Sequence, residues 1–325
     1  MDEFRHEKTA CRYGKKCYAF MRLTENGYRQ DDIGHCSVYF HDTRRGGMTT
    51  NDNFGFKKFV SAFQTWDPDT PREIEFWHGN INKGDLVKEL ESNGFGYVMN
   101  PTNGPYKHLD EVVQEKLNHP RHIRIGSPLS DEQMLAIILY CGTDAYADMR
   151  SDEIQYTMQT FHWGEAAKKQ KWPVFSNILD DAIRCLNEAD KDRRPSRVYH
   201  GLKDIEVDPK TFNNESRAAL YQQHNKQHFK YGTFVSTSWD KEVSLSFMGN
   251  HGSLLTIDLT NESNDKICGA DVSWISKFPI ESEFLIARSA TFDIQQMYFS
   301  QDHTYQIVDV VAGRYCHYIQ NCIQY

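Results

Sequence analysis

The sequence changes character at Arg193-Arg194-Pro195, and this change limits the folds open to the chain. Before it, apolar residues recur at helical spacing over residues 134–140, 152–161 and 175–188. From Arg197 onward, short segments of alternating apolar and polar residues predominate, which is typical of β-strands. A run of helices followed by a run of strands predicts an α+β protein, with a helical lobe leading into a β-rich lobe.

Local signals add boundaries to this pattern. Ser130 and Gln133 have the spacing of a capping box at a helix start, and Gly142 is a stop signal for that helix. In the C-terminal lobe we expect strands at 197–200, 232–238, 253–259, 283–287 and 305–311, and helices at 215–228 and 240–247. Upstream we expect strands at 73–77 and 96–99 and a helix at 83–91.

Length and charge exclude some classes of protein. A chain of 325 residues suggests two or three domains at about 100–200 residues each. Its formal net charge of −8 weighs against nonspecific binding of nucleic acid. We find no apolar run of the roughly 18 residues that would cross a membrane and no apolar signal core at the start. We therefore expect an intracellular protein, nuclear or cytoplasmic, with no membrane partner.

Residues 1–45 are rich in Cys, His and charge and poor in aliphatic residues, so this segment needs a staple to fold. Cys11 and Cys17 are separated by five residues, and so are His35 and His41. Two thiolates and two imidazoles suit tetrahedral zinc, whose binding can supply folding energy. We therefore predict one structural Zn²⁺ held by these four side chains. The other reading is that they lie close in sequence by chance.

The residues around this cluster carry a resemblance. Cys11-Arg-Tyr-Gly-Lys-Lys-Cys17-Tyr18, followed by His35 and His41, resembles the poly(ADP-ribose)-binding zinc finger. The resemblance implies that the finger binds poly(ADP-ribose) or ADP-ribosylated proteins, with Arg12, Tyr13 and Tyr18 as candidate contacts.

Three short motifs follow one another in the β-rich lobe. They are Arg197-Val-Tyr-His200-Gly201, Gly232-Thr-Phe-Val-Ser236-Thr237-Ser238 and Lys277-Phe-Pro-Ile-Glu281-Ser282-Glu283. Each has an ordinary structural reading when taken alone. The hydroxyls could cap a helix, the two carboxylates could lie on a solvated strand edge, and the histidine could be part of the core.

In this order, the three motifs resemble the mono-ADP-ribosyltransferase family of the Arg-Ser-Glu class, over about residues 197–311. The resemblance implies a helical lobe packed on a mixed, mostly antiparallel β-sandwich. We expect a zinc finger at 1–45, an unassigned α+β segment at 46–126 and a catalytic domain at 127–325, divided into a helical lobe (127–195) and a β-rich lobe (196–325).

The resemblance also assigns roles. Glu283 would stabilise the positive charge that develops when NAD⁺ is cleaved, and Glu281 would orient or deprotonate an acceptor guanidinium. Because the two residues are two apart on a segment expected to be extended, their side chains should point the same way. Ser236 would hold Glu283 in position, and the expected NAD⁺ contacts are His200, Gly201, Ser236, Thr237, Ser238 and Glu283.

His200 departs from the family pattern, which has arginine at this position. A histidine carries a full charge only below its usual pKa of about 6.5. Arg197 cannot replace the missing cation, because strand periodicity points it to the opposite face. Among the aromatic residues, we expect Phe234 and Phe247 in the core, and Trp274 either facing the acceptor or in a surface-anchoring role.

The leading functional hypothesis is transfer of ADP-ribose from NAD⁺ to arginine side chains of an acceptor protein, with the finger recruiting ADP-ribosylated partners. The alternatives are an NAD⁺ glycohydrolase, in which water replaces the acceptor, and a catalytically weak ADP-ribose reader or scaffold. Transfer to a nucleic acid base is a further alternative, against which the net charge weighs.

Overall fold

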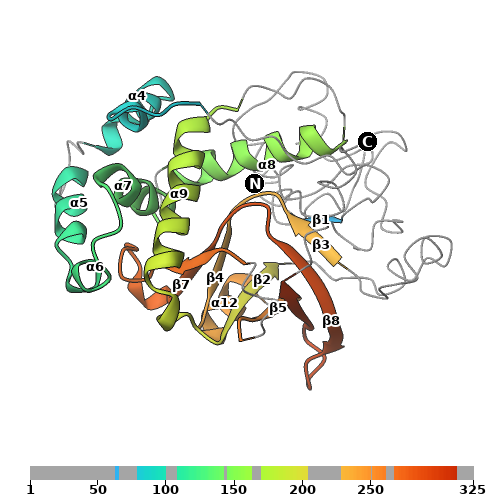
Figure 1. The fold of residues 1–325 in the computed structure, drawn as a ribbon. Coiled ribbons are helices and arrows are strands. Elements are labelled where there is room, and N and C mark those ends of the chain that lie inside the picture. Colours follow the sequence, from blue (N-terminus) through green and yellow to red (C-terminus); the bar gives the residue numbers. More distant parts are fainter. Residues whose placement is uncertain are drawn as a thin grey trace, which may run out of the picture.

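The computed structural model describes residues 63–65, 79–99, 108–142, 145–162, 170–203, 228–249, 251–260 and 267–312. Figure 1 shows the helices of the first half gathered on one side of a curved sheet. Within the described residues, no helix combines the length and apolar composition needed to cross a membrane.

The helical layer precedes most of the sheet in sequence. Ser130 Oγ accepts from the backbone N–H of Gln133 at 3.3 Å, and the Gln133 side chain accepts from the backbone N–H of Ser130 at 3.0 Å, which confirms the capping box. The helix that it starts, α7, is buried along its length from Met134 to Tyr140. The helices and 3₁₀ turns of this layer are α4 (Asp85–Ser92), η2 (Gly96–Val98), α5 (Leu109–Leu117), α6 (Pro120–Arg124), α7 (Asp131–Tyr140), α8 (Tyr146–His162), α9 (Pro173–Ala189) and η3 (Lys191–Arg193).

The described strands form one nine-stranded sheet in the order β1-β3-β8-β9-β5-β2-β4-β7-β6. Neighbouring strands are antiparallel except β5 and β9, which are parallel. The strands are β1 (Phe63–Thr65), β2 (Arg197–Lys203), β3 (His228–Tyr231), β4 (Val235–Ser238), β5 (Gly252–Asp258), β6 (Gly269–Asp271), β7 (Glu283–Ile286), β8 (Thr291–Phe299) and β9 (Gln306–Ala312). Helix α12 (Lys241–Met248) joins β4 to β5, and a 3₁₀ turn, η5 (Pro279–Glu281), precedes β7.

Two apolar cores hold these layers together. The first lies between the helices and the β6–β7 end of the sheet, where α7 and α9 meet residues such as Phe234 and Leu285. The second takes residues from β2, β4, β5, β7, β8 and β9, so the sheet curls around a core of its own. Burial of this apolar area is the main force that orders the motif-bearing strands.

The α+β class and the mostly antiparallel, mixed sheet are confirmed, although the expected sandwich is one continuous sheet. The strand expected at 96–99 is wrong. Gly96–Val98 forms a 3₁₀ turn, because local bonds such as Val98 N–H to the Phe95 carbonyl replace pairing with another strand. The expected strand at 73–77 and residues 215–227 of an expected helix lie outside the described residues, whereas residue 228 begins β3.

The expected division at residues 126 and 127 is not marked by a break in packing. Leu86, Leu90 and Val113 belong to the same apolar core as α7 and α9. Glu89 on α4 also accepts the backbone N–H groups of Val174 and Phe175, at 2.9 and 2.7 Å, and so caps the start of α9. The described part of the segment before 127 is therefore packed as part of the helical layer.

Candidate active site

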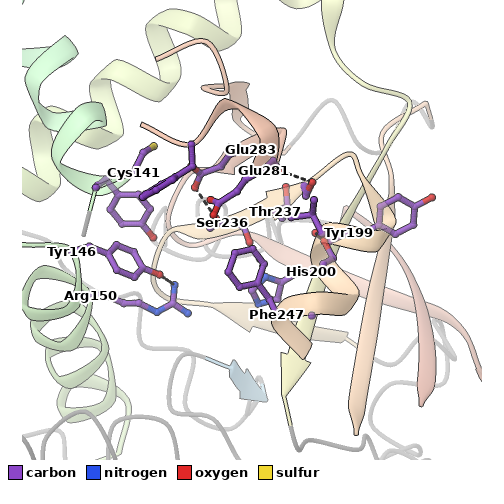
Figure 2. Close-up of a pocket in the computed structure, with 17 residues that line it drawn as sticks. Cys141, Tyr146, Arg150, Tyr199, His200, Ser236, Thr237, Phe247, Glu281 and Glu283 are labelled. Carbon is purple, nitrogen blue, oxygen red and sulfur yellow. Dashed lines mark hydrogen bonds between the residues drawn. The ribbon is translucent and has the colours of Figure 1, made fainter. Parts of the chain in front are cut away.

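A cavity of about 390 Å³ opens where α8 and the end of α7 face strands β2, β4 and β7 and helix α12. Its size is within the range of small-molecule pockets. Figure 2 shows side chains from both lobes directed into it. The cavity lining includes every site residue predicted in the β-rich lobe, namely His200, Gly201, Ser236, Thr237, Ser238, Glu281 and Glu283.

Glu283 is the buried carboxylate of the cavity. It is the first residue of β7, and the antiparallel register pairs it with Ser238, so that Ser236 lies diagonally across on β4. Ser236 Oγ donates to Glu283 Oε1 at 2.6 Å (Figure 2). The Glu283 side chain is only 6% exposed, and burial raises its pKa while the bond from Ser236 opposes that rise. The hydroxyl therefore favours the ionised carboxylate in a site that otherwise disfavours charge.

The two hydroxyls that follow Ser236 hold the backbone of the carboxylate segment. Thr237 Oγ1 donates to the Phe284 carbonyl at 2.5 Å, and Ser238 Oγ donates to the Glu281 carbonyl at 2.7 Å. Both residues were predicted as NAD⁺ contacts. Their hydroxyl hydrogens are already used within the protein, so their observed part is to fix where Glu281 and Glu283 stand.

The backbone conformation that places Glu281 at the cavity was not predicted from the sequence. The expectation of an extended Glu281–Glu283 segment is wrong, because Glu281 ends the 3₁₀ turn η5 and Ser282 has φ 51° and ψ 46°. The left-handed conformation of Ser282 costs about 1–2 kcal/mol for a residue with a Cβ. The turn still places both carboxylates on one cavity, and the pKa of Glu281 is raised by burial and then by the charge of Glu283.

The surroundings of His200 favour its neutral form. Its Nδ1 lies 2.7 Å from the Ser236 carbonyl, and because a carbonyl only accepts, Nδ1 carries the hydrogen. Burial, followed by the nearby charge of Arg150, lowers the pKa of His200 to about 4. Nε2 is then left as an acceptor, which suits a sugar hydroxyl and not a phosphate oxygen.

Gly201 has a steric reason to be glycine. A Cβ at this position would lie 2.3 Å from the backbone carbonyl oxygen of Ser244 and 3.0 Å from the Cβ of Met248. Helix α12 therefore packs directly against the backbone of β2. This close approach lets α12 form one wall of the cavity.

Reasoning from motifs missed the cavity residues of the helical lobe, among them Cys141, Tyr146 and Arg150. Cys141 follows α7, and Tyr146 and Arg150 lie on α8, all far upstream of the three motifs. Arg150 Nη1 donates to Tyr146 Oη at 3.1 Å. Their spacing of four residues on one helix was a visible signal for mutual contact, but nothing in the local sequence links α8 to the strands.

The aromatic expectations had different outcomes. Phe234 is a core residue at 1% exposure, as expected, whereas the core assignment of Phe247 is wrong. Phe247 is 60% exposed and lines the cavity (Figure 2). The buried residues of α12 are Ser244 and Met248 instead.

Trp274 anchors its loop to the helical layer. It is 9% exposed, and its ring stacks on those of His119 and His122 at centroid distances of 5.1 and 6.0 Å. Lys116 Nζ donates to the Trp274 carbonyl at 2.7 Å, and Trp274 Nε1 donates to the Asp271 carbonyl at 3.1 Å. Of the two roles expected for this residue, these contacts support the anchoring role.

The predicted zinc ligands Cys11, Cys17, His35 and His41 lie outside the described residues. Among the residues that the structure does describe, no group of three or more His, Cys, Asp or Glu side chains is arranged to hold a metal ion.

One family model matches a part of the chain that contains the three motifs. Residues 175–313 match the family model described as ADP-ribosyltransferase exoenzyme. The match covers less than half of the chain, but it contains all three motifs and the Ser236–Glu283 pair. This part of the chain is therefore similar to the ADP-ribosyltransferase exoenzyme family. Arg150 and Tyr146 fall outside the matched stretch.

Solved structures with some likeness to the chain have low identities. The ADP-ribosyltransferase HopU1 of Pseudomonas syringae pv. tomato DC3000 is 15% identical, with a TM-score of 0.48, over 74% of this chain and all of HopU1. The eukaryotic mono-ADP-ribosyltransferase ART2.2 is 17% identical, with a TM-score of 0.42, over 79% of this chain and 96% of ART2.2. The effector XopAI of Xanthomonas axonopodis pv. citri is 12% identical, with a TM-score of 0.45, over 72% of this chain and 89% of the XopAI chain. A search of curated proteins found no significant match.

Proposed function

We propose that the protein transfers ADP-ribose from NAD⁺ to an acceptor and releases nicotinamide. The observation that carries the proposal is the 2.6 Å hydrogen bond between Ser236 and the buried Glu283 at the cavity, because both residues lie in the part of the chain that matches the transferase family. A buried carboxylate that a hydroxyl orients, and whose ionised form that hydroxyl favours, suits a reaction in which positive charge develops on the substrate.

The roles of Glu283, Ser236 and His200 follow from the charge that develops when the bond between nicotinamide and ribose breaks. Cleavage of the bond between the nicotinamide nitrogen and the ribose leaves positive charge on the ribose ring. The Glu283 carboxylate would stabilise that charge, and Ser236 would keep the carboxylate from turning away. The neutral His200 would accept a hydrogen bond from a ribose hydroxyl at Nε2, which orients the sugar without adding a positive charge.

We propose arginine as the acceptor, with Glu281 as its partner. Glu281 lies at the cavity beside Glu283, and burial raises its pKa, so it is a stronger base than an exposed carboxylate. Such a group can pair with a guanidinium and take up the proton that the nitrogen loses when it bonds to the ribose.

Agmatine, a small guanidine, provides the test. Incubation of the full chain with NAD⁺ and agmatine should release nicotinamide and give an ADP-ribosyl-agmatine adduct detectable by mass spectrometry. Glu283→Gln should abolish both products, whereas Glu281→Gln should lose the adduct and keep release of free ADP-ribose. No NAD⁺ consumption by the wild-type chain would contradict the proposal and favour the reader, and free ADP-ribose without adduct would favour the glycohydrolase.

The N-terminal segment is proposed to bind one Zn²⁺ through Cys11, Cys17, His35 and His41 and to recruit the enzyme to ADP-ribosylated partners inside the cell. The two cysteines and two histidines, and their spacing in the sequence, support this proposal. Metal analysis of the purified chain should return about one zinc per protein. Cys11→Ser should lose it and Cys185→Ser, at a free cysteine of α9, should keep it. Zinc-free wild-type protein would contradict this.

A further inference from the structure

We propose that Cys141, at the end of α7, is a positioning residue for Glu283, whose carboxylate its thiol holds from the helical lobe while Ser236 holds it from β4. The inference rests on the proposed function. It adds to that site a residue that lies outside the three motifs and outside the stretch that matches the family model. Glu283 is then held from both lobes, so the packing of the lobes against each other sets where the carboxylate stands.

The position of Cys141 is fixed by the helix that it ends. The C-terminal part of α7 is buried, and Cys141 is the C-cap residue, whose backbone N–H donates to the Ile137 carbonyl at 2.9 Å. The side chain is 7% exposed and still lines the cavity, together with Glu281 and Glu283. Figure 2 shows Cys141 and Glu283 on the same side of the cavity, with His200 on the other. A side chain in close-packed surroundings moves little, so it can restrain a neighbour.

The thiol acts on the carboxylate in the same direction as the hydroxyl of Ser236. Burial raises the pKa of Glu283, and the hydrogen bonds from Ser236 and then from Cys141 lower it. A thiol is a weak donor, so it favours the ionised carboxylate less than a hydroxyl does. The two donors belong to different elements, β4 and α7, and together they restrain the carboxylate more than either does alone.

The thiol can donate only while it keeps its proton. Burial, and then the charge of Glu283, raise the pKa of Cys141 well above its usual value; the charge of Glu281 adds to the rise and a hydrogen bond with Ser276 opposes it. A thiolate here would place a third negative charge against two carboxylates. Cys141 therefore stays a neutral thiol at physiological pH and is a donor, not a nucleophile.

Cysteine suits this position because one side chain serves both the core and the cavity. Cys141 belongs to the apolar core between the helices and the β6–β7 end of the sheet. A free cysteine behaves there as a small apolar side chain and is buried at less cost than a hydroxyl. It can therefore pack with the helices and still present its S–H group to Glu283.

The kinetic test uses two substitutions at Cys141 in the full chain. Cys141→Ala removes the donor and should lower kcat for nicotinamide release about 3- to 10-fold, the range for an ordinary hydrogen bond, with KM for NAD⁺ changed less than about twofold. The acid limb of its kcat profile should move to higher pH, because the pKa of Glu283 rises. Cys141→Ser keeps a donor and should hold kcat within about twofold of wild type, with the acid limb at or below its wild-type position.

The matched control is Cys185→Ala, at a cysteine of α9 that is not among the residues lining the cavity. It makes the same substitution in the same lobe and should change neither kcat nor the acid limb. A role in packing alone would lower the free energy of unfolding, measured in urea, without moving the acid limb and without separating Cys141→Ala from Cys141→Ser.

A second measurement does not depend on turnover. The carboxyl carbon of Glu283, assigned with Glu283→Gln, reports its own pKa in an NMR titration of protein made with isotope-labelled glutamate. That pKa should be higher in Cys141→Ala than in wild type and unchanged in Cys185→Ala.

Three results would overturn the inference: an unchanged pKa of Glu283 in Cys141→Ala, equal falls of kcat in the alanine and serine variants, or a rise in KM without a fall in kcat. If Cys141→Ala does not fold, Cys141→Val, which fills the space without a donor, takes its place and should give the same shift. Wild-type protein that does not consume NAD⁺ contradicts the proposed function, and the NMR titration then still decides the role of Cys141. Active wild type with an indifferent Cys141→Ala contradicts only this inference.

Discussion

Ser236 Oγ donates to Glu283 Oε1 across 2.6 Å, joining adjacent antiparallel strands through a partly buried hydrogen bond. The bond is diagonal in the register, because Glu283 is paired with Ser238. Ser238 is at the same time bonded to the carbonyl of Glu281. The Ser-Thr-Ser segment therefore acts as a frame that holds both carboxylates, and Ser236 is the member that touches a carboxylate directly.

Removal of this hydroxyl should change both rate and pH dependence. Ser236→Ala should lower kcat by about 10- to 100-fold, the effect of losing a hydrogen bond to a charged group. The bond from Ser236 lowers the pKa of Glu283, so its loss should raise that pKa and move the acid limb of the kcat profile to higher pH. Nicotinamide release measured across pH provides the test.

The control for this experiment is Ser246→Ala on α12, whose hydroxyl donates to the Val243 carbonyl and which is not among the residues that line the cavity. This variant should keep the wild-type rate and profile. A uniform loss of rate in Ser236→Ala without a shift of the acid limb would show that the hydroxyl matters only for folding or packing.

His200 should remain neutral throughout the physiological range. Its pKa is lowered to about 4, so imidazole nitrogen shifts in NMR spectra should show no ionisation between about pH 8 and pH 5. The His200→Asn variant assigns the resonances. A titration of His200 with a midpoint near its usual pKa of about 6.5 would mean that burial and Arg150 do not act on it as described.

The same shift predicts how stability depends on pH. The pKa of His200 is lower in the folded chain than its value of about 6.5 in the unfolded chain. At pH values between the two, the unfolded chain therefore binds more protons than the folded chain. The stabilising contribution is fully present above about pH 6.5 and is lost as the pH falls toward 4. The free energy of unfolding, measured in urea at pH 7 and at pH 5, should fall more between these two pH values for wild type than for His200→Asn.

The sequence was sufficient for features that are local in the chain. The capping box at Ser130 and the strands that carry Ser236 and Glu283 were predicted, because each depends on near neighbours and on alternation. The turn at Ser282 was not, because a left-handed serine has no composition signal and the conformation is imposed by the bonds from β4.

Features that join the two lobes could not be predicted in the same way. Arg150 lies 50 residues before His200, and only the packing of the helical layer on the sheet brings them to one cavity. Strand β8 was missed because apolar and polar residues do not alternate in its second half, where Gln295 and Gln296 are followed by Met297, Tyr298 and Phe299. Phe247 was assigned to the core from its apolar type, although the lining of a binding cavity can also be apolar.

Gly201 should tolerate no side chain, because the backbone of α12 occupies the space. Gly201→Ala would place a Cβ 2.3 Å from the Ser244 carbonyl oxygen, so that α12 must move, at a cost of about 1–3 kcal/mol or more. Urea unfolding should show the loss, together with weaker NAD⁺ binding. Gly96→Ala is the control, since its nearest neighbour is the flexible Glu91 side chain and a smaller loss is expected.

Trp274 should be the main anchor between the helical layer and the loop that leads to Glu281. Trp274→Ala removes a nearly buried ring from its stacks on His119 and His122, and should lower the free energy of unfolding by about 3–5 kcal/mol. Trp239→Ala is the matched control, because Trp239 is 36% exposed and its loss should cost about 0.5 kcal/mol. Both are measured by urea unfolding.

Because the loop also positions Glu281, Trp274→Ala at a temperature where it remains folded should lose agmatine adduct in favour of free ADP-ribose. Equal losses of stability in the two variants, or an unchanged ratio of adduct to ADP-ribose, would contradict an anchoring role for Trp274.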